Sequence, residues 1–331
     1  MSDAAQREPD LIADIGGTNA RFALTDPRSP EPDLQQVRSL ANADFASLQH
    51  AAEHYLAETG ARPRRAAIAV ASPVAGDEIR LTNRAWSFSR AELQATLKLE
   101  QLDIINDFGA VAWAVPILRP QDRITLHGSG DAPMRGPVSV LGPGTGLGVA
   151  LLVGDADGGW RVVETEGGHV SFAPLGDEEL AISRWVSARH GRCSTERLLS
   201  GTGLSYLDAC LGGMPAGSHE RPLRDPAQVV DAALEGHDLV ARRSLARFCA
   251  ILGSVAGDTA LIHGARSVVI AGGIVPRFIP FLRSSAFRER FLAKGRFAAL
   301  LESVPIHVIT HPSPGLLGAA VALRQGKGAD A

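Results

Sequence analysis

The hydrophobic residues fall mainly in short runs, which are typical of buried strands, separated by stretches with helical spacing. Helical spacing is clearest over Phe45–Leu56, where Asp44 is the expected N-cap and Gly60 the expected stop, and over Leu245–Ile262. A closing helix is predicted over 315–323. Because strands alternate with helices, the pattern predicts an α/β fold with mixed sheets and flanking helices. The predicted strands are 11–15, 21–25, 66–71 (ending at Pro73), 103–105, 137–141, 149–153, 160–163, 267–271 and 306–309.

Two glycine-rich turns, Gly16–Asn19 and Gly142–Gly148, each join a pair of predicted strands. This repeated arrangement predicts two related α/β domains that face each other across a cleft. A length of 331 residues also favours two domains. We expect a small domain over 1–116 plus 311–331 and a large one over 117–310. The irregular segment Arg119–Pro137 is the expected crossing between them.

Composition narrows the class of protein further. Hydrophobic residues make up 45% of the chain and charged residues 21%, as in globular proteins. A net charge of −3 leaves no basic footprint for nucleic acid. The three cysteines form no C-x-x-C pair, which argues against a zinc site or a disulfide framework and favours a reducing compartment. Neither the charged start, Met1–Asp10, nor the glycine-broken stretch Gly136–Gly154 resembles a signal or a membrane span, so a cytoplasmic location is expected.

Both glycine turns are candidate phosphate sites. Glycine lets backbone N–H groups approach phosphate oxygens, and Asp14 at the strand end can hold Mg²⁺. For the first turn, a plain hairpin is an equally good interpretation. The second turn lacks the third glycine of a dinucleotide fingerprint and the Gly-Lys of a Walker loop. It is either a ligand-free turn or a phosphate loop with Thr145 at its centre, and the presence of two such turns favours the second interpretation.

The dipeptide Asn106-Asp107 directly follows a predicted strand, where α/β sheets bind their ligands. An Asp at this place can accept a proton from a hydroxyl nucleophile, as phosphoryl transfer to an alcohol requires. Asn106 can bind neighbouring sugar hydroxyls. Taken alone, however, the dipeptide is explained more simply as the cap of the following helix.

Polar groups suited to a polyol occur at Glu166, His169 and Glu196. Their spacing lacks the H-E-x-x-H pattern of a zinc-binding helix, and Glu196 can also be an ordinary surface charge. Gly272-Gly273 ends a predicted strand and leaves space for a flat ring or for another backbone.

Taken in order, these segments resemble the bacterial glucokinase family, within the group that shares the actin and hexokinase ATPase fold. The resemblance covers nearly the whole chain. It is carried by Ile12–Leu24, Leu81–Ser89, Ile104–Ala110, Gly142–Ala150, Glu166–Pro174, Glu196–Gly201, Ala271–Phe278 and Pro314–Gly318.

The resemblance implies that the chain transfers phosphate from ATP, with Mg²⁺, to the 6-hydroxyl of glucose, the first step of glycolysis. Asp107 would be the catalytic base. The sugar would be held by Asn106, Asp107, Glu166, His169 and Glu196. The nucleotide would be held by Asp14, Gly16, Gly17, Thr18, Asn19, Gly144, Thr145, Gly146, Gly272 and Gly273, with Asp14 serving the metal. A homodimer is expected from the family.

Three alternatives stay open at this point. A kinase of the same fold can act on mannose, fructose or an N-acyl sugar. A sugar-sensing regulator can keep the fold without catalysis, although Asp107 and both glycine turns disfavour it. A Rossmann dehydrogenase is the weakest alternative, because the fingerprint fails.

Overall fold

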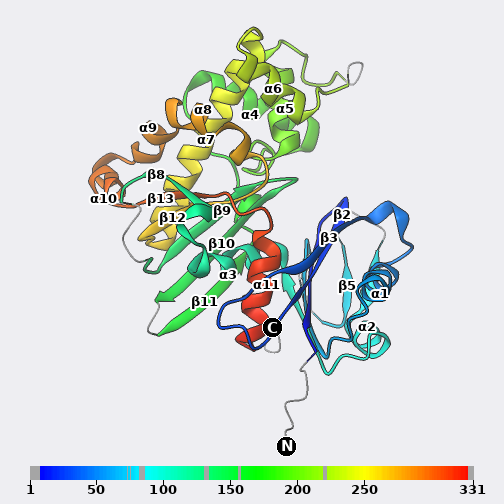
Figure 1. Ribbon diagram of the computed structural model, residues 1–331. Helices are drawn as coiled ribbons and strands as arrows, with labels where there is room; N and C mark the ends of the chain where they lie inside the picture. Colours follow the sequence, from blue (N-terminus) through cyan, green and yellow to red (C-terminus); the bar gives the residue numbers. More distant parts are fainter. Residues whose placement is uncertain are drawn as a thin grey trace, which may run out of the picture. The chain divides into compact units, whose positions relative to one another are not determined.

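The computed structural model describes residues 8–72, 74, 76–81, 86–129, 134–155, 158–218 and 222–326 (Figure 1). Pro73, the expected end of a strand, and residues 82–85 of the segment Leu81–Ser89 lie outside the described residues. The chain forms two compact units. Unit 1 consists of Met1–Leu118 and His311–Ala331, and unit 2 of Arg119–Thr310.

Unit 1 is built on a five-stranded sheet with the order β3-β2-β1-β4-β7. β1, β4 and β7 are parallel, whereas β2 and β3 continue from β1 as an antiparallel meander. Within this five-stranded sheet, only β3 has no counterpart among the predicted strands, because it is an edge strand with mostly exposed side chains and no hydrophobic run. The short strands Glu78–Arg80 and Ser87–Ser89, which pair outside this sheet, were not predicted either. The strands are β1 (Asp10–Ile15), β2 (Asn19–Thr25), β3 (Gln35–Ala41), β4 (Arg65–Val70) and β7 (Gln101–Asn106), with a separate pair β5 (Glu78–Arg80) and β6 (Ser87–Ser89).

Helices cover both faces of this sheet (Figure 1). On one face Leu11, Ala13 and Ile15 of β1 share a core with Tyr55 of α1. The other face is covered by α3 and α11, which lie side by side (Figure 1) and contact β4. A methyl group at Gly318 of α11 would lie 1.6 Å from the Ala110 carbonyl oxygen, so the two helices cross at backbone contact. The helices are α1 (Leu48–Thr59), α2 (Arg90–Thr96), α3 (Asp107–Ala114) and α11 (Pro314–Arg324), with 3₁₀ turns at Asn42–Asp44 and Val115–Ile117.

The expected N-cap of α1 is wrong. Asp44 lies in a 3₁₀ turn, and the cap is Ser47, whose Oγ accepts a hydrogen bond from His50 N at 3.3 Å. Both residue types are good caps, so the local sequence does not decide between them. The predicted stop is confirmed, because Gly60 ends the helix with a φ of 69°.

Unit 2 is built on a six-stranded sheet with the order β11-β10-β9-β12-β13-β8. Its first five strands have the same relative directions as the strands of the unit 1 sheet. Three of them form an antiparallel meander, and two parallel neighbours follow. The segment Arg119–Pro137, expected to be irregular, contains β8, which pairs with β13. The strands are β8 (Arg123–His127), β9 (Val138–Pro143), β10 (Leu147–Asp155), β11 (Gly159–Thr165), β12 (Ser267–Ile270) and β13 (Ile306–Ile309).

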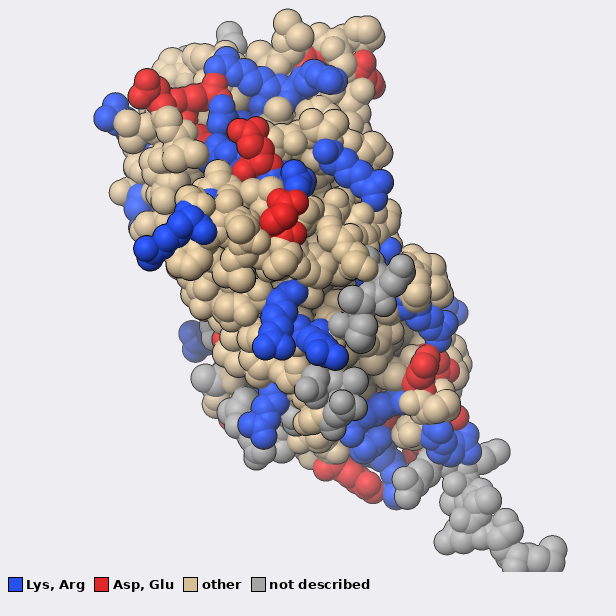
Figure 2. Space-filling view, turned by 90° about the vertical axis from the view of Figure 1, so that its left-hand side faces the viewer, with Lys and Arg blue, Asp and Glu red and all other residues tan. Residues whose placement is uncertain are grey.

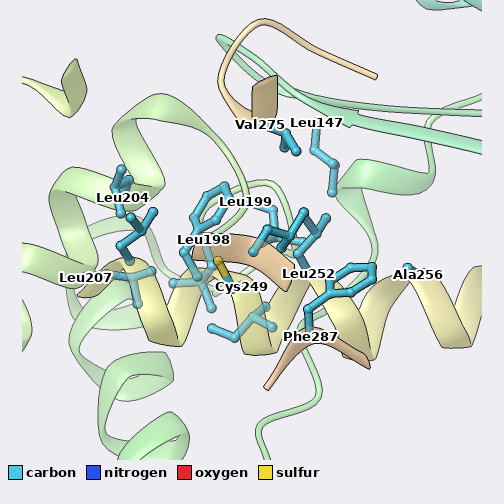
Figure 3. Close-up of a cluster of buried hydrophobic side chains, with 14 of the residues drawn as sticks. Leu147, Leu198, Leu199, Leu204, Leu207, Cys249, Leu252, Ala256, Val275 and Phe287 are labelled. Atoms are coloured by element: carbon cyan, nitrogen blue, oxygen red, sulfur yellow. The ribbon is translucent and has the colours of Figure 1, made fainter. Parts of the chain in front are cut away.

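The helices of unit 2 gather around α7, which runs through the middle of the group (Figure 1). Among the described helices, only α7 is long and apolar enough to cross a membrane, and 67% of its apolar window is buried inside the protein. Its residues Cys249, Leu252 and Ala256 contribute to the hydrophobic core shown in Figure 3. The helices are α4 (Gly176–His190), α5 (Gly201–Leu211), α6 (Pro226–Glu235), α7 (Leu239–His263), α8 (Ile279–Ser284), α9 (Phe287–Leu292) and α10 (Ala298–Glu302), with 3₁₀ turns at Pro120–Asp122, Gly167–His169, Val275–Phe278 and Gly295–Phe297.

On the face shown in Figure 2, basic and acidic side chains are interspersed rather than separated by sign.

Candidate active site

The first glycine turn joins β1 to β2 in unit 1. Gly16 N donates to the Asn19 carbonyl at 3.0 Å, which closes the turn. Asn42, which is fully buried, supports the turn from behind: its Nδ2 donates to the Gly16 carbonyl at 2.8 Å and its N to the Thr18 carbonyl at 2.9 Å. With these carbonyls held inward, the exposed side chains of Thr18 and Asn19 lie on the outer surface.

Asp14 lies near the end of β1, directly opposite Arg21 of β2. Its side chain is 18% exposed, and its Oδ2 lies 3.7 Å from Arg21 Nη1. Burial raises the pKa of Asp14, and Arg21 offsets this increase only partly. Gly315, at the start of α11, leaves room for the carboxylate, because a methyl group there would lie 2.8 Å from Oδ2. A desolvated carboxylate of this kind gains from a nearby cation.

Asn106 and Asp107 lie at the same edge of the sheet as the first turn. The register places Ile15 of β1 beside Val70 of β4, and Val70 beside Asn106 of β7. Because all three strands are parallel, their carboxyl ends lie in one row, with adjacent strands about 4.8 Å apart. The fold of unit 1 therefore brings Asp14 and Asp107 to one edge.

Asn106 is the N-cap of α3. Its Oδ1 accepts hydrogen bonds from Phe108 N at 2.9 Å and Gly109 N at 3.0 Å, so capping occupies this oxygen. The amide Nδ2 is the part of Asn106 that can donate to a sugar hydroxyl. Asp107 is the first residue of α3, and its Oδ1 accepts from Phe108 N at 2.7 Å. The positive end of the helix favours a carboxylate there.

The second glycine turn, in unit 2, is shorter than the sequence predicts. β9 extends to Pro143 and β10 begins at Leu147, so only Gly144–Gly146 form the turn. Gly144 N donates to the Gly146 carbonyl at 2.8 Å, and the Gly144 carbonyl accepts from Gly201 N, at the start of α5, at 2.8 Å. Thr145 is exposed at the tip.

Gly272 lies against this turn. Its φ is 90°, and a methyl group there would lie 2.1 Å from the Pro143 carbonyl oxygen, so no other residue fits without a shift of the backbone. β9 and β12 are parallel neighbours, which places Gly272-Gly273 and Gly144–Gly146 at one edge of the sheet. A methyl group at Gly144 or Gly273 would meet nothing within 4 Å, so the surface at both positions is open.

The candidate sugar-binding side chains of unit 2 lie around His169. Its Nε2 lies 3.7 Å from Glu166 Oε2, and its Nδ1 lies 3.9 Å from Glu196 Oε1. Glu196 is near because its N donates to the Gly168 carbonyl at 2.9 Å. Glu166 and His169 are more than half exposed, whereas the Glu196 side chain is 27% exposed. In the described part of the chain, no group of three or more acidic, His or Cys side chains is arranged to hold a metal ion.

A sequence model of the glucokinase family matches residues 11–326. The chain is 45% identical over 334 aligned residues to a glucokinase of Cupriavidus metallidurans, with 100% of this chain and 98% of the relative covered. It is also 45% identical to a glucokinase of Chromobacterium violaceum, with 95% of this chain and 89% of that protein covered.

The chain belongs to the glucokinase family.

Solved structures agree with this family assignment. The crystal structure of a glucokinase from an Antarctic psychrotroph has a TM-score of 0.82 and 37% identity, with 96% of this chain and 99% of that chain covered. A glucokinase from Balamuthia mandrillaris, solved in complex with glucose, has a TM-score of 0.83 at 23% identity, with 98% of this chain and 95% of that chain covered. The second likeness concerns the fold alone. The predicted fold class, two α/β domains with mixed sheets and flanking helices, is confirmed.

The first glycine turn of unit 1, with the exposed Thr18 and with Asp14 near it, has the chemistry that a magnesium-bound phosphate would need. The second turn, in unit 2, also lies at the carboxyl edge of parallel strands and carries an exposed threonine. Asp14 supplies a hard oxygen ligand, which Mg²⁺ prefers. Because Mg²⁺ usually binds one or two carboxylates together with substrate phosphates, a single aspartate beside a phosphate loop fits this ion better than a closed metal cage does.

Sequence reasoning missed three residues that shape the site. Asn42 holds the first turn, Gly315 makes room for Asp14, and Gly201 N holds the second turn. Asn42 acts through its side-chain amide and its backbone N–H, Gly201 through its backbone N–H, and Gly315 through space that a side chain would fill. Only Gly201, inside the segment Glu196–Gly201, and Gly315, inside Pro314–Gly318, lie in segments that the resemblance singles out.

Proposed function

We propose that this glucokinase family member transfers the γ-phosphoryl group of ATP to the 6-hydroxyl of D-glucose. Membership of the glucokinase family over nearly the whole chain carries this proposal. The polar residues around His169 and the carboxylate of Asp107 support it, because the reaction needs groups that bind hydroxyls and a base that accepts a proton.

In this reaction Asp107 accepts the proton of the attacking hydroxyl. The bond between the sugar oxygen and the γ-phosphorus forms as the bond to the β-phosphate oxygen breaks, which leaves ADP. The cap on α3 fixes Asp107 in place, because Asn106 Oδ1 binds two N–H groups of the first turn of that helix. A base fixed in this way needs little reorganisation at the moment of transfer.

The sugar is bound by the Asn106 amide, Glu166, His169 and Glu196. Carboxylates accept hydrogen bonds from hydroxyl groups, and a neutral imidazole both donates and accepts. His169, with a carboxylate within 4 Å of each of its ring nitrogens, offers a set of partners for adjacent hydroxyls of a pyranose. Because each hydroxyl then has a defined partner, an epimer leaves one of these groups without its hydrogen bond and binds more weakly.

In this proposal the two glycine turns bind the phosphates of the nucleotide, Gly272-Gly273 lies beside the adenosine, and Asp14 would hold Mg²⁺. When bound, Mg²⁺ neutralises charge on the phosphate oxygens. Backbone N–H groups and the hydroxyls of Thr18 and Thr145 donate to the same oxygens.

We further propose that the domains are 1–116 plus 311–331 and 117–310, and that the enzyme is a cytoplasmic homodimer. Light scattering on purified protein tests the dimer.

The deciding measurement is ADP release from purified protein with MgATP and, separately, glucose, mannose, fructose or N-acetylglucosamine, with a no-sugar control. We expect glucose-dependent release with a weak response to the other sugars. A preference for a different sugar would change the substrate and keep the mechanism. Absence of sugar-dependent ADP release from folded protein, together with no sugar phosphate formed when ADP or polyphosphate is the donor, would overturn the proposal in favour of a sugar-sensing protein.

A further inference from the structure

The carboxylate of Glu196 lies between the candidate sugar residues and the second glycine turn. Its Oε1 lies 3.9 Å from His169 Nδ1, and its Oε2 accepts a hydrogen bond from Leu147 N at 3.0 Å. Leu147 directly follows the turn Gly144–Gly146. The Glu196 carboxylate therefore lies near His169, a proposed sugar-binding residue, through one oxygen. Through the other oxygen it is bonded to Leu147, the residue that follows the second glycine turn.

The position of this carboxylate depends on Gly146 having no side chain. A methyl group at Gly146 would lie 2.4 Å from Glu196 Oε2 and 3.2 Å from its Cδ, well inside normal contact distance. A methyl group at Gly144, two residues away in the same turn, would meet nothing within 4 Å. Neither glycine has a positive φ, so alanine is not strained by backbone conformation at either position.

The surroundings of Glu196 leave its carboxylate as the part that must move. Glu196 N donates to the Gly168 carbonyl at 2.9 Å. Leu198 and Leu199 are buried in the same hydrophobic cluster as Leu147 (Figure 3), which fixes the backbone on both sides of the contact. Because the core is closely packed, a methyl group at Gly146 displaces the end of the flexible side chain rather than either backbone.

We propose that Gly146, in the phosphate loop, sets the affinity for the sugar by leaving the space in which the Glu196 carboxylate lies, and that the hydrogen bond from Leu147 N couples the sugar residues to that loop. This inference rests on the proposed function, in which Glu196 binds glucose. Glu196 is then shared by the two substrate sites of unit 2. Because coupling free energies are reciprocal, occupancy of either site changes the affinity of the other.

The test is glucose binding without nucleotide, measured by titration calorimetry on wild type, Gly146→Ala and Gly144→Ala. We expect Gly146→Ala to weaken glucose binding about tenfold or more, the usual effect of losing a hydrogen bond to a charged group, and Gly144→Ala to leave it unchanged. In a Glu196→Ala background, Gly146→Ala is expected to have no further effect on the glucose Kd, because the displaced group is already absent.

Equal glucose affinity of Gly146→Ala and wild type would overturn the inference and leave the proposed function intact. Equal weakening by Gly144→Ala, or an undiminished effect in the Glu196→Ala background, would also overturn it, because the effect would then not pass through Glu196. Failure of wild type to bind glucose would instead overturn the proposed function, and the inference with it.

Hydrogen exchange on the wild-type protein tests the coupling without a change at Gly146, should that variant be unstable. We expect glucose alone to slow exchange in the peptide that covers residues 144–147, because a bound sugar fixes the carboxylate that accepts the Leu147 N–H. This protection is expected to be lost in Glu196→Ala. Exchange that glucose leaves unchanged in wild type would overturn the coupling.

Discussion

Replacement of Arg290 by methionine tests the buried ion cluster that joins α4, α7 and α9. Arg290 Nη1 lies 2.6 Å from Glu179 Oε1, and Arg290 Nη2 lies 3.1 Å from Glu179 Oε2. Glu179 is fully buried and Arg290 is 9% exposed. Arg247 Nη1 also donates to Glu179 Oε1, at 2.9 Å. Methionine keeps an unbranched side chain in this place but removes both donors to Glu179, together with the Nε–H that donates to Ser254 Oγ at 2.8 Å.

After this change, Glu179 keeps only Arg247 and the Leu175 N–H, which donates at 2.8 Å. Removal of one partner from a buried ion pair usually costs about 3–5 kcal/mol, because a charge is left undercompensated. Since Arg247 still compensates part of the charge, we expect a loss of about 3 kcal/mol in the free energy of unfolding of unit 2, or about 6–12 °C in Tm for a unit of this size.

Urea unfolding and calorimetry of wild type, Arg290→Met and Arg288→Met measure this effect. Arg288 is the matched control on the same helix: its ion pair with Glu302 is about half exposed, and such pairs contribute little. The double variant Glu179→Met/Arg290→Met is expected to regain most of the lost stability, because an apolar pair can replace a buried ion pair, and Arg247 keeps Glu178 as its partner.

The acid side of the stability profile gives an independent check. Burial raises the pKa of Glu179, whereas hydrogen bonds from Arg290, Leu175 N and Arg247 lower it. The lowering effects together are the larger, so the pKa lies below its usual value of 4.5. The folded state therefore binds the proton more weakly than the unfolded state. This contribution to stability is fully present above pH 4.5 and is lost as the pH falls through the folded pKa.

Arg290→Met should accordingly show a shallower loss of stability in acid than wild type. A loss below about 1 kcal/mol in Arg290→Met at neutral pH, similar to that of an exposed pair, would refute the reasoning.

The remaining predictions concern unit 1. Asp107→Ala is expected to lower kcat by about a hundredfold or more, as loss of a general base does, and near-normal turnover in steady-state kinetics would remove Asp107 from the mechanism. Asn42→Ala, which deletes the donor to the Gly16 carbonyl, is expected to raise the KM for ATP and to leave the glucose Kd unchanged; an unchanged KM would contradict a positioning role. Gly318→Ala is expected to destabilise unit 1 by about 1–3 kcal/mol, because its methyl group would overlap the Ala110 carbonyl; an unaltered melting curve would show that α11 shifts freely.

The strands that position the site were predictable, because each is a buried run bounded by glycine, proline or a polar pair. β13 was predicted with its observed bounds, and β1, β4 and β12 to within one residue at each end. The edge strand β3 was not predictable in this way, because most of its residues are exposed and its sequence has neither a hydrophobic run nor a clear alternation. β8 does alternate between polar and apolar residues, with Ile124 and Leu126 packed against the core, so its pattern could have been found; it was missed because five residues with only two apolar positions form no hydrophobic run.

The local sequence does not contain the arrangement of the site. Glu196 lies far from Glu166 along the chain, and it reaches His169 because Glu196 N binds the Gly168 carbonyl and Ser171 forms a β-bridge with Ser194. These are tertiary contacts between loops, for which no periodicity exists. The role of Asn106 as a helix cap was considered from the sequence, and the structure shows it. The support that Asn42 gives to the first turn could not be inferred, because Asn42 lies in a short 3₁₀ turn after an unpredicted edge strand, where an asparagine is an ordinary turn residue.

The order in which the two units can fold follows from the position of α11 in the chain. All nine residues from Gly315 to Leu323 are buried, and Arg324 donates to the Ser29 carbonyl at 2.8 Å, so unit 1 requires a segment that is synthesised after all of unit 2. Unit 2, by contrast, is continuous, and its ends meet where Thr310 N donates to the Asp122 carbonyl at 2.8 Å. During synthesis on the ribosome, unit 2 can therefore fold before unit 1 is complete. Until α11 has been made, the first strands of unit 1 have an apolar face that no helix covers. In this state the chain is most prone to aggregate and to bind chaperones.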